Sequence, residues 1–324
     1  MLTYIIRRLI GIIPLLLGIT IVSFAIIHLA PGKPTTQQEL MSPRISYEAR
    51  ARLEKLYDLD KPLHIQYIKW LSRIVRLDLG ASIIDGRPVV DKILERIPVT
   101  LTINILALIL ILAVSVPLGI KAASKPGSLF DKTTTVGVFV GFALPAFWVA
   151  LLLMQLFSIK LGWLPISGIK SIDFEYFPWP KKMLDLAHHL ILPVFVSAIG
   201  SLAGFSRYIR QNMIHALSQP FIVNAKAKGL SRRQILYRHA LPNAILPLIT
   251  ILGLSVPGLL GGSIIFESIF ALPGLGQLFY TAVMMRDYNL IMASVVLGAV
   301  LTMLGNLVAD IAYAYADPRI RYRK

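Results

Sequence analysis

The chain has 324 residues, of which 56% are hydrophobic and 15% charged, a balance that excludes an ordinary soluble domain and predicts an integral membrane protein. Its formal net charge of +16 would suggest nucleic acid in a soluble protein, but here the basic residues cluster between long apolar runs, so we expect the lipid bilayer, and no nucleic acid, as their partner. The absence of cysteine excludes disulfides, thiolate catalysis and cysteine-ligated metals.

The first apolar run covers residues 9–30, contains no charged side chain and follows Arg7 and Arg8. A helix of that length spans the hydrocarbon core, which is roughly 30 Å thick. A cleaved signal peptide is the rival interpretation, but no cleavage site with small residues precedes Pro31. We therefore expect residues 1–30 to form a transmembrane helix that enters from the cytoplasm.

Residues 31–96 form a long polar insert with charges of both signs, which we expect outside the cytoplasm. Apolar residues recur within it at steps of three and four, which predicts a helix with one apolar face. Asp60 stands where it could cap this helix, and Pro62 lies near its start. Such a helix would form a lid on the outer ends of the membrane helices, which leaves room for contact with an external partner. Its apolar residues are Leu63, Tyr67, Trp70, Ile74 and Leu77.

Five more runs without charged residues are each long enough to span a bilayer. They cover residues 97–120, 133–159, 186–206, 239–266 and 288–309. Six spans place both termini on one side, and the basic segments at 121–132, 220–238 and 316–324 place that side in the cytoplasm. The sequence thus predicts an all-α membrane protein with a five-helix core at residues 97–315 and a basic tail at 316–324.

The segment 220–238, here called the elbow, is the basic stretch between the fourth and fifth spans, and no acidic residue occurs between Gly204 and Ala240. Pro220 suits the first turn of a short helix, and Gly229 can end that helix with a positive φ. Ser231 and Gln234 have the spacing of a capping box, which predicts a second helix that runs into the fifth span. We expect Ala225 and Ala227 to keep the first helix thin enough to enter a groove on another protein.

The run Ala225-Lys226-Ala227-Lys228-Gly229-Leu230, followed by His239-Ala240-Leu241-Pro242, resembles the EAA loop of binding-protein-dependent ABC transporter permeases. The match has departures, since the Glu-Ala-Ala triplet falls on Val223-Asn224-Ala225 and an apolar residue usually stands at His239. The Ala-x-Ala-x-Gly-Leu form is similar to the dipeptide, oligopeptide and nickel branch.

A second motif supports the same resemblance. Glu267, Phe270 and the run Leu272-Pro273-Gly274-Leu275-Gly276 resemble a signature that follows the fifth span in that family. Lys33 departs from the family's usual Pro-Gly-Asp-Pro after the first span. The resemblance covers nearly the whole chain.

This resemblance implies the type I importer fold and a permease that moves peptides across the cytoplasmic membrane of a prokaryote, with nickel chelates or other small solutes as the alternative cargo. It also implies a second homologous permease chain, two ATP-binding subunits and an extracytoplasmic substrate-binding protein as partners. The sequence has no G-x-x-x-x-G-K-[ST] motif, so we expect no enzyme activity and no cofactor in this chain, with ATP and Mg held by the partner ATPases. In the family the loop docks into an ATPase subunit, which assigns coupling to Asn224, Ala225, Lys226, Ala227, Lys228, Gly229, Leu230, Ser231, Arg232 and Arg233.

Polar and small residues within the spans are candidates for the solute pathway. Asn104, Gln155 and Asn306 could line it or bond across helices. The fifth span is rich in small residues, which favour either local unwinding and a gate or a plain packing face. The gate candidates are Gly258, Gly261, Gly262 and Ser263, with Gly253 and Pro257 nearby.

Two ionisable groups invite other interpretations. We expect Asp310 to pair with Arg207 or Arg210 rather than to relay protons. His188 and His189 are adjacent, so their side chains should point in different directions and disfavour a metal site. A channel or ion-driven transporter would need more acids within the membrane or an inverted repeat, and a scaffold without transport is a further, weaker alternative.

Overall fold

The computed structural model describes residues 2–29, 55, 60–255 and 257–316. Within this part of the chain every regular element is a helix, apart from one isolated bridge between Ala81 and Pro88. Five helices are long and apolar enough to cross a membrane, and a bent pair makes a sixth crossing if it is counted as one span. The expected all-α membrane protein is confirmed at this level.

Contacts divide the chain into two compact units. The first contains residues 1–100, 260–264 and 274–307, and the second contains residues 101–259, 265–273 and 308–324.

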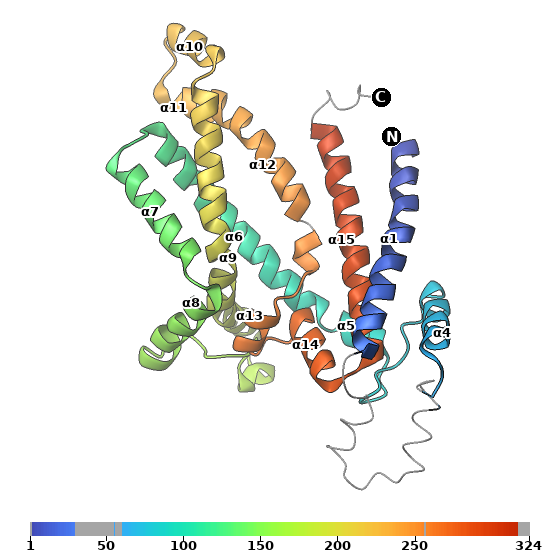
Figure 1. Ribbon diagram of the computed structural model, residues 1–324. Helices are drawn as coiled ribbons and strands as arrows, with labels where there is room; N and C mark the ends of the chain where they lie inside the picture. Colours follow the sequence, from blue (N-terminus) through green and yellow to red (C-terminus); the bar gives the residue numbers. More distant parts are fainter. Residues whose placement is uncertain (1, 30–54, 56–59, 256, 317–324) are drawn as a thin grey trace. The chain divides into compact units, whose positions relative to one another are not determined.

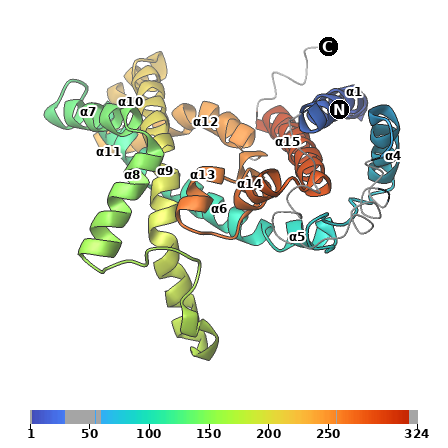
Figure 2. The ribbon, with the colours of Figure 1, turned by 60° about the horizontal axis from the view of Figure 1, so that its bottom comes forward.

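The first unit is built on α1 (Leu2–Leu29), α4 (Leu63–Val75), α5 (Val89–Leu94), α14 (Leu275–Met285) and most of α15 (Tyr288–Ala316). Figures 1 and 2 both show α4 beside α1. Trp70 of α4 is buried against Phe24 of α1 and Met292 of α15, and the Tyr67 hydroxyl lies 3.0 Å from the Thr20 hydroxyl. The amphipathic helix expected in the insert is therefore present and packs on two membrane helices.

Both expected ends of that helix need correction. Pro62 occupies the N-cap position and no side chain caps the helix, so the expected role of Asp60 is wrong. The carbonyl of Pro62 instead accepts the amides of Ile65 and Gln66. Leu77 is 87% exposed because the helix ends at Val75 and the chain turns there with a φ of 60° at Leu77.

A buried polar contact fastens the end of the insert to the start of α15. Asp287 accepts hydrogen bonds from the Ser82 hydroxyl, from the amide of Ile83 at 3.1 Å and from the amide of Leu290 at 3.3 Å. The last bond caps α15. The Asn289 side chain donates to the Ala81 carbonyl at 2.7 Å.

The second unit is arranged around α9 (Trp179–Leu217), with α7 (Leu129–Ala143) and α12 (Leu241–Ser255) on opposite sides of it (Figures 1 and 2). It also contains most of α6 (Ile97–Ser124), α8 (Ala146–Leu153) and most of α13 (Ile264–Ile269). Figure 1 shows the short helices α10 (Pro220–Ala227) and α11 (Arg232–Gln234) at the C-terminal end of α9.

Two expected spans are not continuous helices. The third bends by 98° between α7 and α8, where Leu144 is extended because a residue before proline disfavours the helical conformation. The fifth breaks after Ser255 into a 3-10 turn, Pro257–Leu260, and a non-helical stretch at residues 261–263 before α13 begins. The bend was not expected, whereas local unwinding is one of the two alternatives predicted for the small residues of the fifth span.

Candidate functional site

The first arm of the elbow is α10, and its ends follow the sequence signals. Pro220 is in its first turn, where the missing N–H costs no helical bond. Gly229 has a φ of +74° and donates its amide to the Lys226 carbonyl at 2.9 Å. A Cβ at Gly229 would meet no atom within 4 Å, so the requirement for glycine is conformational rather than steric.

The second arm begins with the predicted capping box. The Ser231 hydroxyl accepts the amide of Gln234 at 3.4 Å, and the Gln234 side chain accepts the amide of Ser231 at 2.8 Å. The chain then continues through a π-helical turn, Ile235–Ala240, into α12. The elbow is therefore helical on both sides of Gly229 and joins α9 to α12 without a long linker.

One face of the elbow is buried in its own unit. Ile222, Ala225 and Ile235 are 1%, 5% and 6% exposed and belong to one apolar cluster with Ile209 and Met213 of α9. Of the two alanines expected to keep the first helix thin, Ala225 therefore points its side chain into this core, while Ala227 is exposed.

The opposite face of the elbow is exposed. Val223 is 63% exposed and Phe221 38% exposed, so apolar side chains stand on this surface beside cations. The exposed members of the predicted coupling set are Asn224, Lys226, Ala227, Lys228, Gly229, Ser231, Arg232 and Arg233, while Leu230 is half-buried. This exposed face therefore combines apolar side chains with positive charges.

An ion pair beside the elbow was not predicted from the sequence. Asp131, in the first turn of α7, is buried and accepts both Nε and Nη2 of Arg210, at 2.5 and 2.7 Å. Asp310, the acid expected to pair with Arg210, has its side chain outside the described residues. The signal overlooked was the spacing of Ser128 and Asp131, which is typical of a helix start. Arg207, the other expected partner, stacks over the Phe139 ring at 4.9 Å.

The pathway candidates fall into different surroundings. Asn104 donates to the carbonyl of Leu259 at 2.8 Å and to that of Gly258 at 3.4 Å, and thus bonds to the broken part of the fifth span. Gln155 is exposed on a π-helical turn, Met154–Lys160, and Asn306 is half-buried on α15. The contact between Asn104 and Gly258 joins two members of this set.

Two of the glycine candidates line a cavity of about 180 Å³ in the first unit. Gly261 and Gly262 share it with Gly276, Ser294 and Gly298, among others. A Cβ at Gly262 would lie 2.1 Å from the amide nitrogen of Gly276. Backbone therefore touches backbone where residues 261–263 cross the first turn of α14, with Ser263 at the edge of this crossing.

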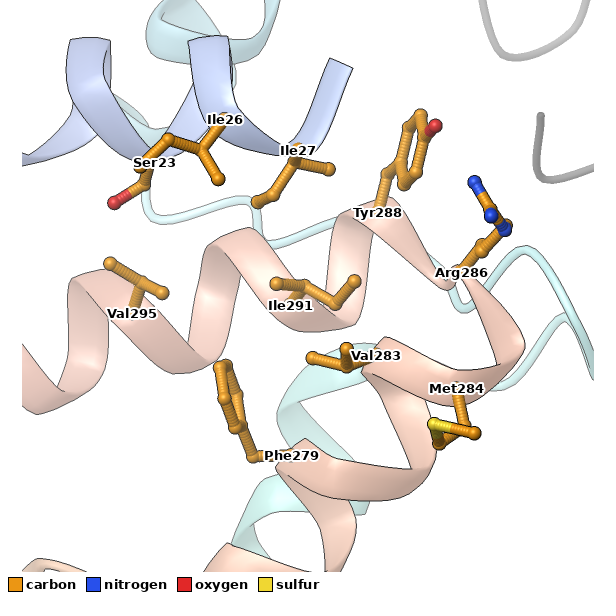
Figure 3. A pocket seen from close by; sticks show the side chains of 10 residues that line it. All are labelled: Ser23, Ile26, Ile27, Phe279, Val283, Met284, Arg286, Tyr288, Ile291 and Val295. Carbon is orange, nitrogen blue, oxygen red and sulfur yellow. The ribbon is translucent and has the colours of Figure 1, made fainter. Parts of the chain in front are cut away.

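A larger cavity of about 510 Å³ lies between α1, α14 and α15 (Figure 3). Its lining is apolar except for Ser23, Arg286 and Tyr288. None of the predicted pathway residues lines this cavity, so it does not coincide with the predicted route.

The two adjacent histidines point in different directions, as expected. His188 Nε2 lies 2.7 Å from the Trp163 carbonyl, and His189 Nδ1 lies 2.8 Å from the Asp185 carbonyl. Among the described residues no group of three His, Asp or Glu side chains could hold a metal ion.

Comparison with known proteins identifies the family. Residues 115–322 match the binding-protein-dependent transport system inner membrane component, and residues 1–104 match the N-terminal membrane component of such systems. The chain belongs to this permease family. It is thus a multi-pass membrane component of a binding-protein-dependent transport system, as the elbow motif indicated.

Several permeases resemble the chain from end to end. The oligopeptide transport system permease protein AppB of Bacillus subtilis is 45% identical over 323 residues, which cover 99% of this chain and 100% of the relative. The dipeptide transport system permease protein DppB of Escherichia coli K12 is 36% identical over 342 aligned positions and is covered completely, as is this chain. The glutathione transport system permease protein GsiC of Salmonella paratyphi A is 35% identical, again over the full length of both chains.

Proposed function

We propose that this chain is the permease subunit of an ABC importer that moves peptides across the cytoplasmic membrane, driven by separate ATPase subunits that dock on the elbow. The observation that carries the proposal is the elbow itself, a positive-φ glycine between two helical arms that are continuous with α9 and α12. The peptide cargo is inferred from the relatives, which are named for oligopeptides, dipeptides and glutathione.

The elbow can act as a lever because its inner face is packed. Ile222 and Ile235 insert into the same apolar cluster as Met213 of α9 and Ala244 of α12. A close-packed core switches between discrete packings rather than deforming continuously, so a push on α10 would move these helices as rigid bodies. The ATPase cycle would thereby switch the access of the solute pathway.

The exposed face of the elbow suits a groove with an apolar floor and an acidic rim. Phe221 and Val223 would enter the floor, while Lys226, Lys228 and Arg233 would meet the rim. Because one elbow engages one ATPase subunit, the full transporter would need a second, homologous permease chain for a second ATPase. ATP and Mg would be bound by those subunits.

The topology follows from this docking. With the elbow in the cytoplasm, both termini and the basic tail at 316–324 are cytoplasmic, and the insert at 31–96 faces the external binding protein. Asp287 and Trp70 would hold the insert on the first unit while that protein docks.

The broken fifth span would form part of the peptide route. Residues 261–263 are not helical, and Gly261 and Gly262 line the cavity of about 180 Å³, in keeping with the rule that non-helical backbone at membrane depth is buried in protein or lines a cavity. Asn104 would hold the rim of this break, at Gly258 and Leu259.

The experiment that tests this proposal uses the absence of cysteine from the chain. Val223→Cys would place a single thiol on the exposed face of the elbow, and Ile172→Cys, at a fully exposed position in the loop before α9, serves as the control. We expect a membrane-impermeant maleimide to label Val223→Cys only in inside-out vesicles and Ile172→Cys only in right-side-out vesicles. The ATPase subunits should protect the thiol at position 223 and leave the thiol at position 172 reactive. Labelling at position 223 from outside, or without protection, would refute the docking role of the elbow.

A further inference from the structure

The turn between α6 and α7 is tied to α9 by a buried carboxylate. Asp131 is 3% exposed and uses both oxygens, with Oδ1 accepting Nε of Arg210 at 2.5 Å and Oδ2 accepting Nη2 at 2.7 Å. Oδ2 also accepts the amide of Gly127 at 2.8 Å, and the Ser128 hydroxyl accepts the amide of Asp131 at 3.3 Å. A two-pronged guanidinium–carboxylate contact fixes orientation as well as distance.

The same turn is tied to the elbow. The Arg232 guanidinium donates to the carbonyl of Ser124, the last residue of α6. Carbonyl groups at the end of a helix lack partners within the helix and carry partial negative charge, so a cation is favourable there. Arg232, assigned to coupling with its neighbours, thus bonds within its own chain.

Close packing joins α6 to this assembly as well. A Cβ at Gly119 would lie 2.7 Å from Cγ2 of Ile209, which shows how closely α6 approaches α9. Ile120 and Ile209 belong to the apolar cluster that contains the elbow residues Ile222 and Ile235.

By contrast, α7 runs close along α9 but buries no apolar side chain completely. Val136, Phe139 and Phe142 are 61%, 53% and 74% exposed, and the chain bends by 98° directly after the helix. The contact between Arg207 and Phe139 is a stacking contact on an exposed ring. The ion pair between Asp131 and Arg210, here called the clamp, is a directional hydrogen-bonded link between α7 and α9.

We propose that Asp131 is a positioning residue for coupling, which makes α7 move together with α9 when the elbow is pushed. The inference rests on the proposed function of the elbow and adds α7 to α9 and α12 as a helix that moves with the elbow. Motion would pass from α10 to α9 through the apolar cluster, and from Arg210 to α7 through the carboxylate. Without the clamp, ATP hydrolysis would still move α9 and α12. However, α7 would not follow α9 completely, and the solute pathway would open incompletely.

The test uses the complete transporter, with its partner subunits, in proteoliposomes. The variants are Asp131→Asn, which removes the negative charge, and Arg210→Lys, which keeps the positive charge but loses the paired hydrogen bonds of the guanidinium group. The readout is peptide transported per ATP hydrolysed, which a merely structural contact would not change in an assembled complex. Lys170→Gln, which breaks the exposed Lys170–Glu175 pair of the same unit, is the matched control.

We expect Asp131→Asn to assemble and hydrolyse ATP while its transport per ATP falls about tenfold or more, because one charge of the pair is lost. Arg210→Lys should fall less, and Lys170→Gln should stay within about twofold of the unaltered transporter, as expected for an exposed pair. A normal ratio in Asp131→Asn would overturn the inference.

A second variant covers the case in which Asp131→Asn does not assemble. The double change Asp131→Leu with Arg210→Met removes both charges together and leaves no buried ion uncompensated. If this variant assembles with a reduced ratio, the clamp itself is needed for coupling, and a normal ratio would overturn the inference. Maleimide protection of Val223→Cys in the same complexes separates the two hypotheses, since the elbow can dock whether or not α7 follows it.

Discussion

At the scale of single residues, Gly229 shows how one backbone angle shapes the elbow. Its φ of +74° lies in the left-handed region, which costs a residue with a Cβ about 1–2 kcal/mol. We expect the backbone at Gly229→Val to leave the left-handed region. This change would redirect α10 so that it no longer fits the groove of the ATPase subunit. Co-purification of the ATPase subunits should be lost while insertion into the membrane survives.

Gly86 offers a control for this change, because it has a similar φ of +70° and open space around it, outside the elbow. Gly86→Val introduces the same kind of strain, and we expect it to retain the ATPase subunits. Equal retention by both variants would show that the shape of the elbow at Gly229 does not matter for assembly.

Asp131 also belongs to the residue scale. Its neighbours Gly127 and Ser128 supply a helix start, and the buried charge then needs a cation, which Arg210 provides. Local sequence accounts for the capping, while only the packing of α7 against α9 selects the partner.

At the scale of elements, the crossing of residues 261–263 with α14 is the tightest feature of the broken span. A Cβ at Gly262 would lie 2.1 Å from a backbone nitrogen, so Gly262→Ala forces two main-chain segments apart. We expect this variant to lower the thermal unfolding midpoint of the purified transporter, since overpacking costs about 1–3 kcal/mol. Fluorescence-detected size-exclusion chromatography after heating would measure the shift.

Gly258→Ala is the matched control, since a Cβ there would meet nothing within 4 Å and the glycine lies in the same broken span. We expect its midpoint to remain close to that of the unaltered chain. If both variants unfolded at the same temperature, the close backbone crossing would have no energetic importance.

At the scale of the whole molecule, the cargo is a property of the assembled transporter. Cells that lack this chain should lose uptake of labelled dipeptides or oligopeptides, and a plasmid-borne copy should restore it. Uptake of chelated nickel should be unchanged, because the similar permeases of Bacillus subtilis and Escherichia coli are named for peptides. Loss of nickel uptake with intact peptide uptake would contradict the proposed substrate class. A copy that carries Lys170→Gln, which breaks only an exposed ion pair, serves as the control for expression of an altered chain.

The sequence by itself determined the features that depend on neighbouring residues. Long apolar runs predict spans because transfer into lipid depends on composition and length. Pro220, Gly229 and the Ser231–Gln234 box predicted the elbow because helix starts and stops are set within a few residues. Family motifs then extended this local information to the function of the chain.

Only the tertiary structure decided which distant residues meet. It buried Ala225, paired Arg210 with Asp131 and brought Gly262 against Gly276, although each of these pairs or faces looks ordinary in the sequence. The bend at Leu144 also was not predicted, although its cause, the proline that follows Leu144, is local, because the length and composition of an apolar run do not give the direction of the helix. Spacing along a chain fixes separation only over a turn or two, and beyond that distance the packing of helices determines which groups are in contact.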